Sequence, residues 1–219
     1  NRYGQKLAPI GRNLKYVYEI EDYRVIPEVK DAAFIVATDV NNPLYGQEGA
    51  AHIYAPQKGA SAPEVRRLDE GLRHLAQYIE NHYGLKLQEM NGAGAAGGLG
   101  GGCVAFLNAR IQSGADVIFR ELHMDKLAQW ADVIITGEGK IDRQSLYEKL
   151  LAKVAAVARE KQVALWAVCG YIDDDVKALE ALGLKEIFSL ASDKNEVAHA
   201  IENSRAILQK KAAELAAKL

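Results

Sequence analysis

The segment TGEGKIDRQS, from Thr136 to Ser145, brings together residue types that could act on a phosphate group. Carboxylates such as Glu138 and Asp142 can hold Mg²⁺ or orient a hydroxyl, and a cation such as Lys140 can offset developing negative charge. The structural alternative is that Asp142 or Ser145 only caps the helix that follows, and that Lys140 is a solvated loop charge. We interpret Ser145 as a cap, and Glu138 with Asp142 as functional residues.

A glycine-rich tract, GAGAAGGLGGG, begins at Gly92 and is a second candidate. It matches the dinucleotide-binding pattern GxGxxG at Gly92, Gly94 and Gly97, and Asp116 follows roughly 20 residues later. However, residues 86–89 are mostly polar, whereas the first strand of a dinucleotide-binding fold is apolar. Three interpretations stay open: a nicotinamide site, close helix packing, or a turn whose backbone N–H groups bind an anion.

Asp39, Asn42 and Lys58 form a third group of candidates. The apolar run 32–37 predicts a buried strand, and Asp39 would then lie at its carboxyl end, where α/β proteins tend to bind ligands. Asn42 lies in the turn that follows. Lys58 belongs to the glycine turn PQKG, where a lone lysine is more often solvated than catalytic.

Composition narrows the class of protein. The net charge of −2 shows no basic excess of the kind that nucleic-acid binding requires, and no apolar run approaches the roughly 20 residues of a membrane helix. We therefore expect neither a nucleic-acid nor a membrane partner. The cysteines, Cys103 and Cys169, lie in apolar segments without a CxxC pattern, which predicts buried thiols and a cytoplasmic location. The first residue is Asn1 rather than Met, so we expect the chain to be part of a longer gene product.

The elements that must position these groups follow from periodicity. Tyr16, Tyr18 and Ile20 alternate with polar residues and predict a half-exposed strand. Ser61 and Glu64 form a capping-box pattern and predict a helix from Ser61 to Tyr83.

The last third of the chain predicts alternating strands and helices. The expected strands are 132–136, 163–168 and 187–190, and the expected helices are 145–161, 174–182 and 195–219. This order predicts an α/β fold with a parallel sheet, and it places Glu138 and Asp142 at the carboxyl edge of that sheet.

Four segments taken together resemble the bacterial glycerate kinase family of the first type. They are TDVNNPLYG at 38–46, PQKGA at 56–60, the glycine tract and TGEGKIDRQS. The resemblance covers the whole chain but only the later part of the family's length. It implies two lobes: residues 1–130 correspond to an inserted mixed α/β lobe, and residues 131–219 to the C-terminal part of a Rossmann-like parallel β/α lobe.

The resemblance also implies an activity: transfer of the γ-phosphoryl group of ATP to D-glycerate, giving 2-phosphoglycerate, with Mg²⁺. The implied catalytic residues are Asp39, Asp142 and Lys58, and the implied metal ligands are Glu138 and Asp142. Substrate or phosphate would be bound by Asn42, Gly92, Gly94, Gly97, Gly98, Lys140, Gln144 and Lys149.

Two departures from the family pattern leave an alternative open. The family's opening strand and an upstream glycine and serine motif have no counterpart, and its Gly-Lys-x-Pro sequence is here Glu148-Lys149-Leu150-Leu151. The alternative function is therefore a truncated, inactive homologue that binds a small anion or a partner. A sheet without its early strands would expose an edge, so we expect a homodimer or association with the missing N-terminal segment.

Overall fold

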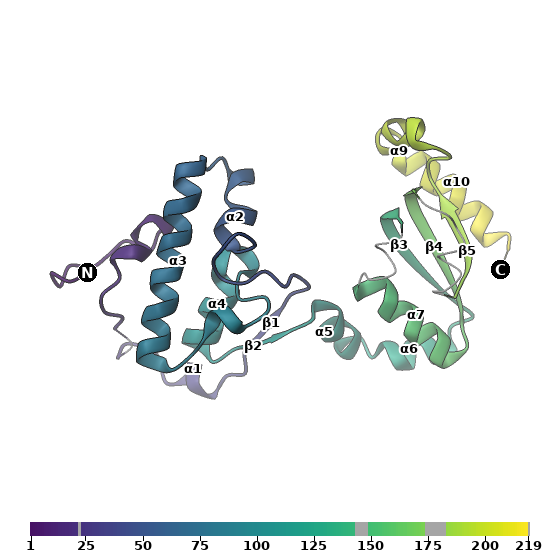
Figure 1. Ribbon diagram of the computed structural model, residues 1–219. Helices are drawn as coiled ribbons and strands as arrows, with labels where there is room; N and C mark the ends of the chain where they lie inside the picture. Colours follow the sequence, from purple (N-terminus) through teal and green to yellow (C-terminus); the bar gives the residue numbers. More distant parts are fainter. Residues whose placement is uncertain (22, 143–148, 174–182, 219) are drawn as a thin grey trace. The chain divides into compact units, whose positions relative to one another are not determined.

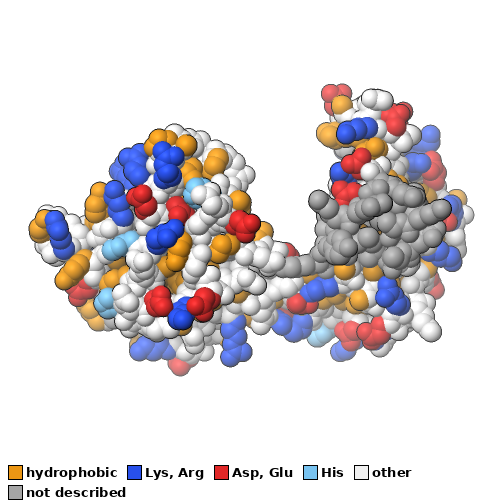
Figure 2. All heavy atoms as spheres, viewed as in Figure 1, with side chains coloured by type: hydrophobic (Ala, Val, Ile, Leu, Met, Phe, Trp, Pro, Cys, Tyr) orange, Lys and Arg blue, Asp and Glu red, His pale blue; other side chains and the backbone are white. Residues whose placement is uncertain are grey.

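The computed structural model describes residues 1–21, 23–142, 149–173 and 183–218 of the chain. The chain forms two compact units, Asn1–Val117 and Ile118–Leu219, which we call unit 1 and unit 2 (Figure 1). Acidic and basic side chains are interspersed on the face of each unit in Figure 2. Among the described helices, none is both long enough and apolar enough to cross a membrane.

Unit 1 is mainly helical and contains one short parallel pair of strands, in which Ile35 of β1 lies opposite Arg110 of β2. Its elements in chain order are η1 (Gly11–Tyr16), α1 (Glu28–Asp31), β1 (Ile35–Ala37), α2 (Ala50–Tyr54), η2 (Pro56–Lys58), α3 (Ala62–Tyr83), η3 (Leu87–Glu89), α4 (Ala95–Leu107), β2 (Arg110–Gln112) and the first part of α5 (Gly114–Glu121).

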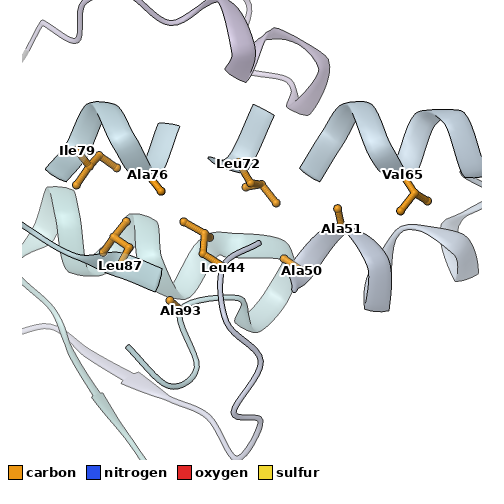
Figure 3. Packing of buried hydrophobic residues seen from close by; sticks show 9 residues of the cluster. All are labelled: Leu44, Ala50, Ala51, Val65, Leu72, Ala76, Ile79, Leu87 and Ala93. Atoms are coloured by element: carbon orange, nitrogen blue, oxygen red, sulfur yellow. The ribbon is translucent and has the colours of Figure 1, made fainter. Parts of the chain in front are cut away.

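Helix α3 is the framework of unit 1, and its predicted ends are confirmed. The backbone N–H of Ser61 donates to Glu64 at 2.8 Å within a complete capping box, and Gly84 closes the helix in the left-handed conformation. The apolar face of α3 packs on residues from α2, η3 and the loops around them (Figure 3). This core contains Leu44, Ala50, Ala51, Val65, Leu72, Ala76, Ile79, Leu87 and Ala93.

The predicted strand at Tyr16, Tyr18 and Ile20 is wrong. Residues 11–16 form η1, which places Leu14 against the core, while Tyr16 and Tyr18 are exposed. Side chains of α3 take the place of a partner strand: His74 hydrogen-bonds the carbonyl of Val17 at 2.7 Å, and the Tyr78 hydroxyl accepts from the N–H of Ile20 at 3.1 Å. The alternation therefore marked aromatic residues on a surface segment rather than a pleated strand.

Unit 2 contains a parallel three-stranded sheet in the order β3-β4-β5, which confirms the predicted parallel α/β arrangement. Its further elements are α6 (Met124–Trp130), β3 (Val133–Ile141), α7 (Lys149–Lys161), β4 (Ala164–Ile172), β5 (Leu184–Ser189), η5 (Lys194–Glu196), α9 (Val197–Glu202) and α10 (Ser204–Ala216). The helix predicted at 174–182 lies outside the described residues.

Helices cover both faces of this sheet. Successive residues of a strand point to opposite faces, and in β4 Leu165 packs in a cluster with Leu151 and Val154 of α7. The next residue, Trp166, packs with Phe188 of β5 and Leu215 of α10. The middle strand is therefore buried on both sides, as its continuous apolar sequence requires.

Several predicted boundaries in unit 2 are wrong. Strand β4 continues past 168 to Ile172, and β5 begins at Leu184 rather than at 187. Strand β3 does not end at Thr136 but continues to Ile141, which is fully buried against α7 and pairs with Ile172. The expected helix 195–219 is divided at Asn203, whose side-chain amide donates to the carbonyl of His199 at 3.0 Å and so competes with the backbone ladder.

Candidate active site

A lysine joins two carboxylates at the carboxyl edge of the sheet in unit 2. Asp142 directly follows β3 and Asp173 directly follows β4; because these strands are parallel, both residues reach the same edge. The Nζ atom of Lys140 lies 3.1 Å from Asp142 and 2.6 Å from Asp173. The ends of β3 and β4 are also joined by a backbone hydrogen bond of 3.0 Å, from the N–H of Asp173 to the carbonyl of Ile141.

The charges of this cluster reinforce one another. The hydrogen bond to Asp173, and then the one to Asp142, raises the pKa of Lys140 above its ordinary value. The hydrogen bond from Lys140 in turn holds the pKa of Asp173 below its ordinary value. The ammonium of Lys140 and the carboxylate of Asp173 are therefore charged at neutral pH.

Replacing Lys140 by Met should raise the pKa of Asp173 toward its ordinary value, because the largest interaction that favours the carboxylate is removed. A carbon-detected NMR titration of the side-chain carboxyl measures this shift. The pKa of Asp173 is lower in the folded protein than in the unfolded chain, so its ionised carboxylate stabilises the fold at pH values above the ordinary carboxyl pKa. This stabilisation is lost as the pH falls through the pKa of the folded state. Lys185→Met on β5 is the matched control, and an unchanged pKa in Lys140→Met would show that the contact is not formed.

The other predicted residues of this segment are placed differently. Glu138 lies within β3, opposite Cys169 of β4, and is half-buried. Burial raises the pKa of the Cys169 thiol, which is therefore an inert core group rather than a reactive one. Lys149 begins α7, whereas Gln144 lies outside the described residues.

At the TGEG segment, the backbones of β3 and β4 approach closely because residue 170 is a glycine. A Cβ atom on Gly170 of β4 would lie 2.5 Å from the carbonyl oxygen of Gly139. A Cβ on Gly139 would meet nothing within 4 Å, so Gly170 rather than the glycines of TGEG is required for this packing.

In unit 1, Asp39 lies beside Ser113 where β1 and β2 end. The hydroxyl of Ser113 donates to Oδ1 of Asp39 at 2.9 Å and accepts from the N–H of Asp116 at 3.4 Å, at the beginning of α5. The preceding strand is shorter than predicted and is not buried: it spans Ile35–Ala37, and Ile35 is 46% exposed. In the described sheet β1 pairs with β2 alone, which explains why much of its surface stays open.

The glycine tract packs directly on the segment that follows Asp39. The N–H of Gly94 donates to the carbonyl of Asn42 at 2.9 Å, and a Cβ on Gly94 would lie 2.2 Å from the carbonyl oxygen of Pro43. A Cβ on Gly92 would lie 3.1 Å from the methyl group of Thr38. Close packing therefore accounts for Gly92 and Gly94.

Close packing does not account for Gly97. Ala96, Gly97 and Gly98 have φ values of 52°, 79° and 98° and interrupt α4, and a Cβ on Gly97 would meet open space. Left-handed backbone at a residue other than glycine is strained, and such strain clusters at ligand sites. The segment before Gly92 contains the 3₁₀ helix η3 instead of a strand, so the nicotinamide interpretation loses the strand that it requires.

Asn42 has a clear local role. Its amide nitrogen donates to the carbonyl of Glu48 at 2.9 Å, and its amide oxygen accepts from the hydroxyl of Tyr54 at 2.9 Å. These bonds hold the turn after β1 against α2. Lys58, by contrast, is exposed at the end of η2 and lines a cavity together with residues of η1 and α3.

The structure thus brings together Asp39, Asn42 and the glycine tract in unit 1, and Lys140 with Asp142 in unit 2. It adds two residues that the sequence patterns did not single out, Ser113 and Asp173. The rule that pointed to Asp39, a carboxylate at the end of a parallel strand, applies equally to Asp173.

A family model described as the glycerate kinase family matches residues 1–219. The chain belongs to the glycerate kinase family. A glycerate kinase from Halalkalibacterium halodurans is 36% identical over 213 residues, which are 97% of this chain and 56% of that protein. The glycerate 2-kinase of Escherichia coli K12 is 35% identical over 187 residues, which are 85% of this chain and 49% of that protein.

A crystal structure assigned as glycerate kinase 2 of Salmonella typhimurium LT2 shares the fold. It matches with a TM-score of 0.73 and 30% sequence identity, over 99% of this chain and 57% of that one. The mixed α/β fold with parallel sheets is therefore that of a glycerate kinase. The chain spans about half the length of the curated relatives it matches.

Proposed function

We propose that the protein transfers the γ-phosphoryl group of ATP to a hydroxyl of D-glycerate and yields 2-phosphoglycerate. Membership of the glycerate kinase family supports this class of reaction. The observation that carries the site assignment is the contact of Lys140 with both Asp142 and Asp173 at the carboxyl edge of parallel strands. Ligands of α/β proteins bind at this edge.

The residues divide into three proposed roles. Asp142 or Asp39 orients the attacking hydroxyl, and each follows the end of a parallel strand. Lys58 or Lys140 binds a phosphate or the carboxylate of glycerate. Backbone N–H groups around Gly97 bind an anion, which fits the open left-handed turn at this residue, whereas the N–H of Gly98 donates to the carbonyl of Gly94 at 3.1 Å.

Asp142 and Glu138 are the proposed ligands of Mg²⁺. Their carboxylates are the donors that this ion prefers, and Mg²⁺ is commonly bound through one or two carboxylates together with phosphates of the substrate. No cluster of three or more His, Cys, Asp and Glu side chains suited to a metal occurs within the described ranges. Glu138 and Asp142 are four residues apart along an extended strand, about 13 Å, so one ion would need phosphate oxygens of the substrate between them. Bound Mg²⁺ would offset charge on the phosphate oxygens.

The test is ADP release by the intact gene product with ATP and Mg²⁺, with and without D-glycerate. We expect release only when glycerate is present, and its loss when EDTA removes the metal. Phosphorus NMR of the product distinguishes 2-phosphoglycerate from 3-phosphoglycerate. A folded protein that releases no ADP would contradict the proposal and favour a homologue that binds an anion or a partner without catalysis.

A further inference from the structure

A cavity of about 520 Å³ in unit 1 is lined by four cationic side chains from three separate segments. Arg12 and Lys15 belong to η1, and Lys58 ends η2. Arg67 lies on α3. The volume falls within the range of small-molecule sites, and the cavity carries a local excess of positive charge although the whole chain is slightly acidic.

One of these cations, Arg67, interacts electrostatically with the carboxylate of Glu64 in the same cavity wall. None of the four forms a salt bridge or a side-chain hydrogen bond within the described part of unit 1, and Lys15 lies instead over the ring of Tyr16, 5.0 Å from its centroid. The acidic residue of the cavity wall, Glu64, accepts hydrogen bonds from the backbone and hydroxyl of Ser61 at 2.8 and 2.6 Å. The four positive charges exceed the single negative charge of Glu64, so they repel one another, and a bound anion would relieve this repulsion.

The segments that carry the cations are fixed on the core. A Cβ on Gly11 would lie 2.8 Å from Leu68, and one on Gly71 would lie 3.1 Å from Leu14, so η1 and α3 pack closely. The chain turns after Lys58 through Gly59 at φ +89°, held by the bond from its N–H to the carbonyl of Pro56. The cavity is therefore formed before any ligand binds, and little ordering is needed on binding.

We propose that this cavity binds a small molecule that carries at least two negative charges on phosphate groups. Two guanidinium groups can each grip phosphate oxygens with two parallel N–H bonds, and two ammonium groups add point charges. The site goes beyond the proposed kinase activity and does not require it, although Lys58 belongs to both proposals.

Isothermal titration calorimetry of the chain with sodium pyrophosphate tests the site directly. We expect binding that weakens as salt is added, and a loss of roughly 10-fold or more in affinity for Arg67→Ala and for Lys15→Met, since each removes a charge-assisted contact. ADP is the second ligand: affinity equal to that of pyrophosphate shows that phosphate alone is recognised, and tighter binding shows a nucleotide site. Citrate that binds as tightly as pyrophosphate would overturn the assignment to phosphate.

Arg66→Ala is the matched control. Arg66 precedes Arg67 on the same helix and carries the same charge, but it lines a different cavity. This variant should keep pyrophosphate affinity within about two-fold, because only screened long-range charge is lost. Circular dichroism verifies that each variant is folded. Equal losses in Arg66→Ala and Arg67→Ala, or no binding by the folded wild-type chain, would overturn the proposal whether or not the protein phosphorylates glycerate.

Discussion

Asp142→Asn should lower kcat/KM for glycerate-dependent ADP release by about 100-fold or more in the intact gene product, because general base and charge-positioning groups commonly contribute this much. The change keeps the size of the side chain and its ability to cap, but it removes the charge that Lys140 contacts at 3.1 Å. A residue that only capped the next helix would instead change the free energy of unfolding by less than about 1 kcal/mol, with normal turnover.

The control is Asp132→Asn, which removes a carboxylate at the opposite end of the same strand. Asp132 precedes β3 and is exposed, whereas Asp142 follows it. Initial rates across a range of glycerate concentrations separate an effect on kcat from one on KM. Undiminished turnover in Asp142→Asn would remove this residue from the mechanism, and equal losses in both variants would point to a general effect of charge.

Gly94→Ala should destabilise unit 1 by about 3 kcal/mol, the upper part of the usual cost of overpacking. The backbone conformation of Gly94, φ −77° and ψ −7°, suits any residue, so the cost is steric. The new methyl group would lie 2.2 Å from the carbonyl oxygen of Pro43 and 2.9 Å from that of Asn42. These are backbone atoms next to Leu44, which is 2% exposed in the core, so they cannot move without disturbing it.

Gly102→Ala is the matched control, because it makes the same chemical change within α4, the helix that Gly94 precedes. A Cβ on Gly102 would meet nothing within 4 Å, so this variant should be neutral or more stable by about 0.5–1 kcal/mol. Urea unfolding followed by far-ultraviolet circular dichroism measures both effects. Similar unfolding midpoints for the two variants would show that the glycine tract does not pack on the Asn42 turn as described.

The sequence predicted the elements whose ends or faces are determined by residues close together in the chain. The capping box of Ser61 with Glu64 and the left-handed Gly84 bound α3 without help from the rest of the fold. The parallel sheet of unit 2 could also be predicted, because β4 is apolar on both faces and alternates with helices. Both signals lie within a few residues of the feature that they specify.

The failures arose where distant residues decide the structure. The segment around Tyr18 has strand-like alternation, but His74 and Tyr78 of α3 satisfy its backbone, and no local pattern records that. The contact of Lys140 with Asp173 joins two strands through their register. The glycines of the tract look alike in the sequence, and only the structure shows that backbone atoms crowd Gly94 while Gly97 faces open space.

The placement of the two tryptophans has a spectroscopic consequence. Trp130 and Trp166 both lie in unit 2, and unit 1 contains no tryptophan. Trp166 is 6% exposed between Phe188 and Leu215, whereas Trp130 is 75% exposed and already close to the emission of a solvated indole. A red shift of the fluorescence on denaturation therefore comes from Trp166 and reports the detachment of α10 from its sheet. Tryptophan emission does not report the unfolding of unit 1, which has to be measured through tyrosine fluorescence or through the circular dichroism of its helices.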